Sequence, residues 1–200
     1  MTVLRLFIET LDTPIGRFAL VTDEAGCLRA AGFTSDHARM ARQLARYADR
    51  SRYELASSTG PSGVGAAVRR YFDGDLASLD GVRVAFDGTP FQCQVWRALG
   101  RIPCGETRTY AAIAREIGRP RAVRAVGAAN GDNPIALVLP CHRVSGSDGS
   151  LTGYGGGIAR KRWLLGHERA GRSCGARSRR SGGPAALRST RGPRSPSSRS

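Results

Sequence analysis

Residues 109–130 read TYAAIAREIGRPRAVRAVGAAN, and this stretch decides the fold of the C-terminal half of the chain. Apolar residues recur at helical spacing on both sides of Gly118, which interrupts the pattern. Thr109 can cap a helix over 110–117, and a second helix is expected over 121–130. Two short helices joined by a tight turn that contains glycine are typical of a helix-turn-helix.

The segments on either side of this stretch add one helix before it and a loop and a helix after it. On the N-terminal side, apolar spacing predicts a helix over 91–102. On the C-terminal side, the apolar run Ile135–Leu139 predicts a buried strand or extended segment that leads into residues 140–144, PCHRV. A glycine-rich loop over 146–157 follows, and an amphipathic helix is expected over 158–168.

The N-terminal half has the pattern of a small α+β unit. Short strands are predicted at Leu4–Glu9, Arg17–Thr22 and Leu28–Phe33, with turn signals between them. Helical patterns follow over Ala38–Tyr47 and Val64–Phe72. The chain is therefore predicted to be α/β, in the α+β arrangement, with strands first and helices after them.

Composition divides the chain into three parts. We expect an N-terminal domain over 1–87, a helical domain over 88–168, and a disordered tail over 169–200, with the boundary of the two domains near Phe86–Pro90. The tail is rich in Arg, Ser, Gly and Pro, and such a segment cannot bury enough apolar surface to offset its ordering entropy.

Charge and cysteine content narrow the class of protein. The net charge is +15, of which the nine arginines after Glu168 contribute +9, and a basic balance suits a polyanionic partner. Five cysteines without a secretory leader argue against a disulfide framework and favour a reducing compartment. No apolar run approaches the roughly 20 residues that a membrane span needs. We therefore expect a cytoplasmic protein with no membrane partner.

The dipeptide Cys141-His142 places a thiol beside an imidazole after a buried apolar run. A thiol attacks electrophiles as its thiolate, so it needs a base or a positive environment. Neighbouring residues of an extended chain point to opposite sides, so His142 would reach Cys141 only through a water. A base also needs an orienting partner, and Glu168 is a candidate that spacing alone cannot place near it.

Taken together, the motifs over residues 88–168 resemble those of the O6-alkylguanine-DNA alkyltransferase family. The matching motifs, in order, are 88–96 (GTPFQCQVW), 102–107 (IPCGET), Tyr110, 124–127 (RAVG), Asn133-Pro134, 140–144 (PCHRV), Gly149, Gly153-Tyr154 and 161–168 (KRWLLGHE). Residues 1–85 resemble the variable N-terminal domain of the family more loosely.

The resemblance implies a fold and an activity. It implies an N-terminal α+β domain with a small, mainly antiparallel sheet of the ribonuclease H-like kind, and a helical C-terminal domain that carries the helix-turn-helix and the active-site loop 140–144. It implies DNA repair by irreversible, single-turnover transfer of a methyl or larger alkyl group from O6-alkylguanine to Cys141, with O4-alkylthymine left open as a second lesion. The implied partner is double-stranded DNA bearing the lesion, bound through its minor groove by a monomer, with no cofactor and no metal.

The resemblance also implies catalytic roles for five residues. Cys141 would be the acceptor thiol, His142 would deprotonate it through a water, and Glu168 would orient the imidazole. Tyr110 would donate a hydrogen bond to the guanine as its oxygen leaves, and Asn133 would tie the Cys141 loop to the helix-turn-helix.

Two further sets would bind DNA and the extruded base. Arg124 would be the arginine finger that fills the gap left by the flipped nucleotide. The expected DNA-binding residues are Thr109, Arg124, Ala125 and Gly127. The expected residues of the substrate pocket are Val144, Tyr154, Gly155 and Gly156.

Three other functions are compatible with parts of the pattern. A non-catalytic lesion-binding relative would replace the acceptor cysteine, typically with Trp, so Cys141 argues against it. A helix-turn-helix regulator would need side chains that read base edges, and the second helix is rich in Ala and Gly instead. A Cys-His hydrolase would require an acyl pocket that is open to water.

Overall fold

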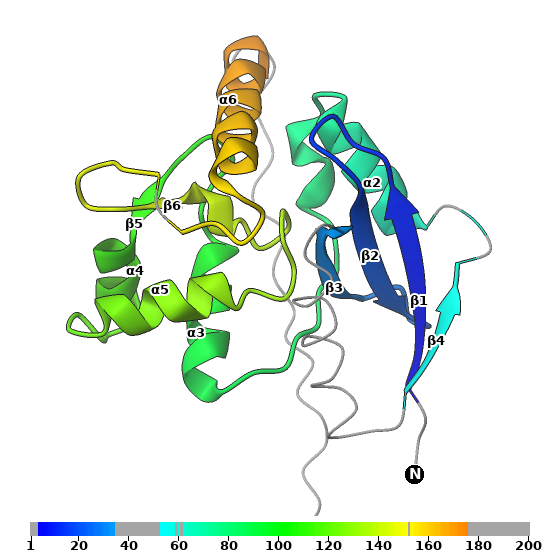
Figure 1. Ribbon diagram of the computed structural model, residues 1–200, viewed down its shortest axis with the longest axis horizontal. Helices are drawn as coiled ribbons and strands as arrows, with labels where there is room; N and C mark the ends of the chain where they lie inside the picture. The colour runs from blue at the N-terminus through cyan, green and yellow to red at the C-terminus, as the bar shows by residue number, and fades with distance from the viewer. Residues whose placement is uncertain (1–3, 35–52, 59, 61, 152, 176–200) are drawn as a thin grey trace, which may run out of the picture.

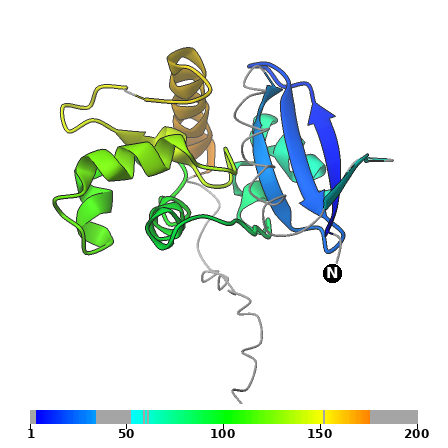
Figure 2. The ribbon, with the colours of Figure 1, turned by 60° about the horizontal axis from the view of Figure 1, so that its bottom comes forward.

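The computed structural model describes residues 4–34, 53–58, 60, 62–151 and 153–175 (Figure 1). The sheet lies on one side of the molecule together with the helix at 63–72, the short helices between residues 90 and 131 lie on the other, and the long helix α6 (Ile158–Gly175) stands between them in Figures 1 and 2. This arrangement confirms the predicted α/β fold with a small sheet followed by helices.

The sheet consists of β1 (Leu4–Leu11), β2 (Phe18–Asp23), β3 (Leu28–Phe33) and β4 (Tyr53–Ser57), in the order β3-β2-β1-β4. β2 is antiparallel to both of its neighbours and only β4 pairs in parallel, so the sheet is mainly antiparallel, as predicted. β4 was not predicted, because most of its residues are exposed and no buried apolar set marks it. The helix predicted over 38–47 lies outside the described residues.

Helix α2 (Gly63–Phe72) confirms the helix predicted over 64–72. Its N-cap is Ser62, whose hydroxyl accepts a hydrogen bond from the Gly65 N–H at 2.8 Å and donates one to Glu9 of β1 at 2.6 Å. Ser62 therefore fixes the start of α2 to the sheet. A short 3-10 helix, η2 (Leu76–Leu79), follows.

Three helices form the second half up to the active-site loop: α3 (Pro90–Leu99), α4 (Tyr110–Glu116) and α5 (Val123–Gly131). α3 begins with a capping box between Thr89 and Gln92, with proline in its first turn, which explains its sharp start. α4 and α5 confirm the two helices predicted over 110–117 and 121–130.

The segment 135–139 is a buried turn, and the prediction of a strand or extended segment there was wrong. Ile135 makes a single bridge to Ala31 of β3, after which the chain turns and Leu137 adopts a φ of 71°. The side chain of Asn133 closes this turn, since its Nδ2 donates to the Leu139 carbonyl at 2.6 Å and its Oδ1 accepts from the Ile135 N–H at 3.0 Å. Short apolar runs do not separate strands from other buried segments, and the closing hydrogen bonds of Asn133 decide the outcome here.

Residues 141–145 also depart from the extended chain that was expected. Cys141–Arg143 form a 3-10 turn, η3, and only Val144–Ser145 are extended as β6. β6 pairs in parallel with β5 (Arg108–Thr109), which leads directly into α4. The chain after the thiol is therefore fixed to the start of the helix-turn-helix.

The two halves share one hydrophobic core. Buried side chains of the sheet and α2, such as Phe18 and Val68, belong to the same cluster as Trp96 of α3 and Leu164 of α6. The division at residues 87 and 88 remains a prediction, and any separation of the two units has to break this common core.

The last helix is longer than predicted. α6 extends beyond Glu168 to Gly175, so the segment expected to be disordered from residue 169 begins as helix, and residues 176–200 lie outside the described part of the chain. Among the described helices, none is both long enough and apolar enough to cross a bilayer.

Candidate active site

Cys141 lies at the start of η3, where α6 packs against this turn. The residue is 2% exposed, and its backbone N–H donates to the Leu139 carbonyl at 2.8 Å. The pairing of β5 with β6 brings Tyr110, the first residue of α4, to the strand that follows the thiol. The candidate nucleophile is thus buried where the helix-turn-helix and the last helix meet.

His142 and Glu168 form a buried pair. Both side chains are fully buried, and His142 Nε2 lies 2.8 Å from Glu168 Oε1, although 26 positions separate them in the sequence. A carboxylate can only accept hydrogen bonds, so Nε2 carries the proton of this bond. In a neutral imidazole, Nδ1 is then the atom with a free lone pair. The predicted pairing of His142 with Glu168 is therefore present in the structure.

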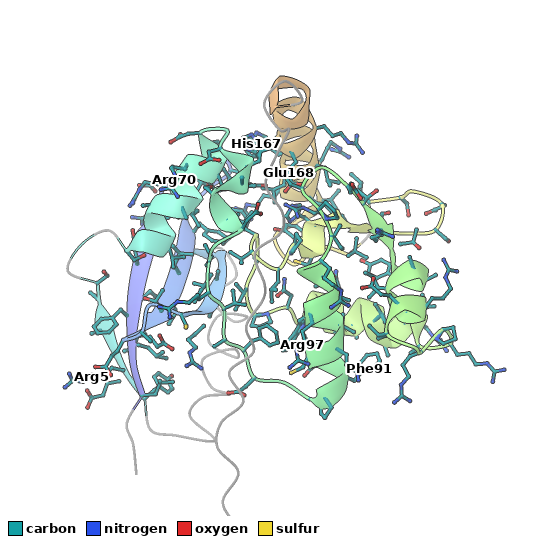
Figure 3. All side chains as sticks on the ribbon, turned by 180° about the vertical axis from the view of Figure 1, so that it is seen from behind. Arg5, Arg70, Phe91, Arg97, His167 and Glu168 are labelled. Carbon is teal, nitrogen blue, oxygen red and sulfur yellow. The ribbon has the colours of Figure 1, made fainter. Side chains whose placement is uncertain are left out.

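Glu168 accepts hydrogen bonds from three further residues. Tyr71 of α2 donates its hydroxyl to Oε1 at 2.8 Å, and the Gly105 N–H donates to Oε2 at 3.0 Å. Arg143 donates through Nη2 to Oε1 at 2.8 Å and through Nε to Oε2 at 2.9 Å. Figure 3 shows Glu168 on the side of α6 that faces α2. The carboxylate is saturated with donors from both halves of the molecule.

The charges of this cluster keep Glu168 ionised and His142 neutral. Burial by itself raises the pKa of Glu168, but the hydrogen bonds and charges of His142 and Arg143 outweigh burial and hold that pKa well below its usual range. Burial lowers the pKa of His142, and the opposing attraction of Glu168 does not restore it. Glu168 and Arg143 neutralise each other, so the imidazole can stay an uncharged base at neutral pH.

The second imidazole nitrogen is the unusual feature of the cluster. His142 Nδ1 is buried and has no hydrogen-bond partner among the described residues. Buried polar atoms are rarely left unpaired, and such an atom in a site often reflects a water or a catalytic role. With Nε2 bonded to Glu168, Nδ1 is the atom that can accept a proton.

Lys161 places a positive charge near the thiol. Its side chain is fully buried and its ammonium donates to the Val144 carbonyl at 2.5 Å. Burial lowers the pKa of Lys161, while the negative charge of an ionised Cys141 acts in the opposite direction.

Tyr110 and Asn133 contact the segments that follow and precede residues 140–144. The Tyr110 hydroxyl donates a long hydrogen bond of 3.5 Å to the carbonyl of Gly153, in the glycine-rich loop. Asn133, fully buried, connects the residue after α5 to the turn that precedes Cys141. Asn133 is thus bonded to the turn before Cys141, and Tyr110 to the glycine-rich loop that follows β6.

The predicted pocket residues lie in β6 and in the glycine-rich loop. Val144 is fully buried, and the ring of Tyr154 lies 6.4 Å from that of His142, edge to face. Gly156 is required by space, because an added Cβ would lie 2.6 Å from the Tyr154 ring and 3.2 Å from Phe33 of β3. Gly155 is exposed.

The predicted DNA-binding residues lie on α5 and at the start of α4. Arg124 and Ala125 are exposed at the beginning of α5, away from the buried cluster. Gly127 faces Tyr110, since a Cβ at this position would lie 4.0 Å from the ring. The hydroxyl of Thr109 accepts from the Ala112 N–H at 3.1 Å and caps α4.

Sequence reasoning missed three residues of this cluster. Tyr71 carried no signal, because nothing in its spacing relates it to Glu168. Arg143 lies in the motif 140–144, but no role was predicted for it. Lys161 did carry a signal, because it is the only lysine among 31 basic residues. A lysine in a chain that otherwise uses arginine indicates an environment that arginine does not fit. Among the described residues, no three His, Cys, Asp or Glu side chains come together as a metal site would require.

A Tyr71→Phe variant tests the contact that joins α2 to Glu168. Burial first, and then the charge of Glu168, raise the pKa of Tyr71, so its hydroxyl stays protonated and donates. Removing a buried hydrogen bond to a charged acceptor is expected to lower the free energy of unfolding by about 1.5–3 kcal/mol. Urea denaturation measures this loss.

The matched control is Tyr53→Phe. The Tyr53 hydroxyl, on β4, has no hydrogen-bond partner within the described residues, and a change below about 0.5 kcal/mol is expected there. Equal changes in the two variants would show that the bond between Tyr71 and Glu168 contributes nothing to the joining of the two halves.

Comparison with known proteins places the chain in a family. Residues 90–170 match the family described as 6-O-methylguanine DNA methyltransferase, DNA binding domain. A methylated-DNA–protein-cysteine methyltransferase of Shigella flexneri is 46% identical over 166 residues, which are 83% of this chain and 97% of the relative. The crystal structure of Mycobacterium tuberculosis O6-methylguanine methyltransferase is similar with a TM-score of 0.65 at 39% identity, over 82% of this chain and 93% of that chain. The crystal structure of Mycobacterium tuberculosis OGT in complex with DNA is similar with a TM-score of 0.65 at 40% identity, over 85% of this chain and 94% of that chain. Since nearly the whole length of the Shigella relative is aligned, the chain belongs to the methylated-DNA–protein-cysteine methyltransferase family.

Proposed function

We propose that this protein repairs DNA by moving an alkyl group from O6 of a damaged guanine onto the sulfur of Cys141. In this step the bond between sulfur and the alkyl carbon forms, the bond between that carbon and O6 breaks, and guanine is restored. The thioether does not regenerate, so each molecule acts once. The observation that carries the proposal is the buried thiol at η3, beside a neutral imidazole that Glu168 holds by a 2.8 Å bond.

The proton path follows from the tautomer of His142. The thiol proton passes through a water to His142 Nδ1, the atom without a protein partner. Lys161 stabilises the thiolate by its charge, and Glu168 stabilises the imidazolium that forms. Tyr110 donates its hydroxyl proton to the guanine as negative charge develops on the leaving base, and the proton held by His142 returns through solvent to the tyrosine, so that the restored guanine and both side chains end neutral.

We also propose that the base enters between the active-site loop and the glycine-rich loop. Val144 and Tyr154 would form its apolar walls, while Gly155 and Gly156 would leave main-chain groups free to bond the base edge. Asn133 would hold the turn before Cys141 in register with α5, because its side chain bonds both ends of that turn.

DNA is the partner, and we propose that α5 enters its minor groove. The target carbon lies inside the base stack, so the nucleotide must first be flipped out, which costs a few kcal/mol. Arg124, exposed at the start of α5, would fill the gap in the stack. Ala125 and Gly127 are small enough to let the helix approach the sugar-phosphate backbone, and Thr109 would act at the start of α4. We further propose that the protein acts as a monomer in the cytoplasm.

An Arg124→Ala variant separates base flipping from chemistry. Repair of a duplex is expected to slow by about 10- to 100-fold, in line with a flipping cost of a few kcal/mol, whereas reaction with free O6-benzylguanine should change less than about 2-fold. Single-turnover rates on both substrates measure the difference. An equal loss of rate on the two substrates would contradict the proposed role of Arg124 in base flipping.

Intact mass spectrometry tests the proposed function directly. After incubation with a duplex that contains O6-methylguanine, each protein molecule should gain one methyl group, and peptide mapping should locate it on Cys141. Tight binding of the lesion with no added mass would instead identify a non-catalytic lesion-binding protein.

A further inference from the structure

We infer that a pocket beside the helix-turn-helix binds a backbone phosphate of the DNA, next to the segment that α5 contacts. The inference rests on the proposed function insofar as DNA is the substrate. It adds a contact that lies on β5 and on the ends of α3 and α4, outside the residues that the proposed chemistry uses.

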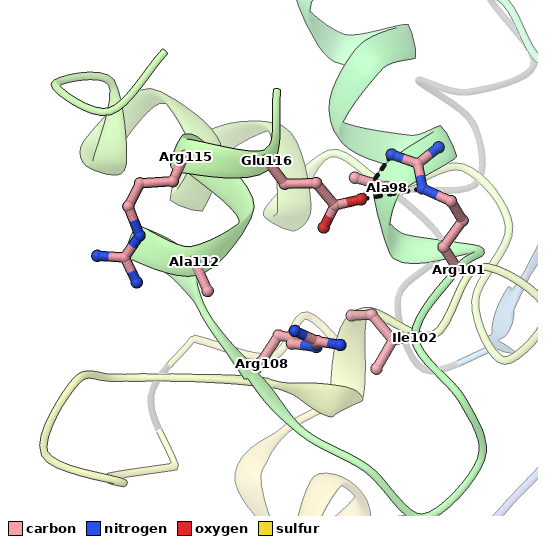
Figure 4. A pocket seen from close by; sticks show the side chains of 7 residues that line it. All are labelled: Ala98, Arg101, Ile102, Arg108, Ala112, Arg115 and Glu116. Atoms are coloured by element: carbon pink, nitrogen blue, oxygen red, sulfur yellow. Dashed lines mark hydrogen bonds and ion pairs between the residues drawn. The ribbon is translucent and has the colours of Figure 1, made fainter. Parts of the chain in front are cut away.

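The pocket, called the arginine pocket below, is a cavity of about 420 Å³ (Figure 4). Three arginines from three different segments line it: Arg101 after α3, Arg108 in β5 and Arg115 in the last turn of α4. The remaining polar residue is Glu116, and small apolar side chains such as Ala98 and Ala112 line the rest. The cavity is therefore a concave surface rich in hydrogen-bond donors.

The charges of the arginine pocket are only partly compensated. Arg101 and Glu116 bond each other at 2.9 and 2.7 Å, as the dashed lines in Figure 4 show. The side chains of Arg108 and Arg115 have no hydrogen bond or ion pair within the described part of the chain. Three cations and one anion leave a local charge of +2, which an anion from outside can neutralise.

The chemistry of the walls favours a phosphodiester over a free nucleotide. Guanidinium groups match phosphate oxygens in geometry and bind them in pairs of hydrogen bonds. No aromatic side chain lines the arginine pocket, so nothing there could stack on a base. The structure offers donors for a phosphate and no platform for a nucleobase.

The position of the pocket favours DNA as the source of the phosphate. Arg108 directly precedes Thr109, which caps α4, so the pocket belongs to the same module as Arg124. α5 has nine residues and is only about 14 Å long, whereas a duplex carries a charge about every 1.7 Å along its axis. A duplex placed on α5 therefore presents further phosphates beyond both ends of the helix. Six exposed arginines lie between the end of α3 and the start of α5, at positions 101, 108, 115, 119, 121 and 124.

The first test removes the two uncompensated charges. In the full chain, Arg108→Gln combined with Arg115→Gln is expected to weaken binding to an undamaged 30-base-pair duplex by about 10-fold at low salt. It should also lower the slope of log affinity against log salt by about 0.9, the value for one lost phosphate contact. The control combines Arg97→Gln with Arg70→Gln, two exposed arginines of α3 and α2 seen in Figure 3, and should change affinity less than about 2-fold. Equal slopes in the two double variants would overturn the inference.

The second test predicts a gain. Glu116→Gln releases Arg101 and raises the local charge to +3, so DNA affinity should increase about 3-fold or more and the salt slope should become steeper. The control is Glu54→Gln, at an exposed position of β4. It makes the same change in total charge and should leave the DNA affinity and the salt slope unchanged. A damaged fold cannot produce a gain, and the absence of any difference between these two variants would contradict a phosphate site.

Two further measurements separate the possible causes of failure. Titration with inorganic phosphate identifies a site for the free ion, and phosphate binding without any effect of the variants on DNA affinity would overturn the DNA assignment. Transfer from free O6-benzylguanine should be the same in all four variants and in the unmodified chain. If the unmodified chain shows no such transfer, the proposed alkyl transfer fails while the DNA-binding measurements still decide the pocket.

Discussion

A Cys141→Ala variant is expected to accept no detectable alkyl group while it still binds duplex DNA that contains O6-methylguanine. The thiol is the proposed nucleophile and is 2% exposed, so it contributes to the reaction and not to the surface that α5 presents. Loss of one sulfur atom at a buried position leaves a small cavity and is expected to cost about 1 kcal/mol of stability. Intact mass and an electrophoretic binding assay measure the two properties on the same sample.

The matched control is Cys104→Ala. Cys104 is half-buried near Glu168, and burial together with the charge of Glu168 raises the pKa of its thiol to about 11. At neutral pH this thiol stays protonated and is a poor nucleophile. The Cys104→Ala variant should therefore transfer one alkyl group per molecule. If Cys141→Ala still accepts an alkyl group, or if only Cys104→Ala fails to accept one, Cys141 is not the acceptor.

The sequence predicts the regular elements well where a buried face repeats. β3 was predicted with its observed bounds and α2 within one residue. The buried residues of α2 recur at helical spacing, and the cap at Thr109 marks the start of α4. The turn at 135–139 could not be predicted in the same way. Its conformation depends on Asn133, whose side chain replaces the backbone partners that a strand would have provided.

The candidate site shows a similar division. The pairing of His142 with Glu168 was expected from the resemblance to a known family, since no spacing rule connects residues on a 3-10 turn and on a helix. Tyr71 and Arg143 also donate hydrogen bonds to the Glu168 carboxylate. Tyr71 lies in α2, however, and reaches Glu168 only because the two halves pack together. Contacts of this kind arise from tertiary structure and leave no local pattern in the sequence.

The contacts of Glu168 determine which variant can test the proposed proton relay. In Glu168→Gln, an amide N–H₂ would replace one oxygen and oppose Arg143, which donates to both oxygens of the native carboxylate. The buried guanidinium would also lose its counter-charge, and breaking a buried ion pair costs about 3–5 kcal/mol. Glu168→Gln should therefore lose both stability and transfer, and it cannot distinguish orientation of the base from support of the fold.

His142→Gln is the sharper test. The glutamine amide can still donate to Glu168, so the buried cluster keeps its hydrogen bonds and its charge balance, and a change in unfolding free energy below about 1.5 kcal/mol is expected. An amide is not a base, however, and loss of a general base is expected to slow transfer at neutral pH by about 10²- to 10⁴-fold. DNA affinity should not change, because His142 is fully buried.

The pH dependence decides between a relay and a structural role. Burial lowers the pKa of His142 below its usual 6.5, so in the native protein the imidazole is neutral at pH 7, and the rate should fall only when acid protonates it, as the pH drops through that lowered pKa. In His142→Gln, hydroxide must produce the thiolate, so the rate should rise about tenfold per pH unit and approach that of the native protein in alkali. Rates of transfer from free O6-benzylguanine between pH 5 and 9, measured with melting curves, give both profiles. If the variant shows the same profile as the native protein, displaced by a constant factor and accompanied by a lower melting temperature, His142 supports the loop around Cys141 and does not act as its base.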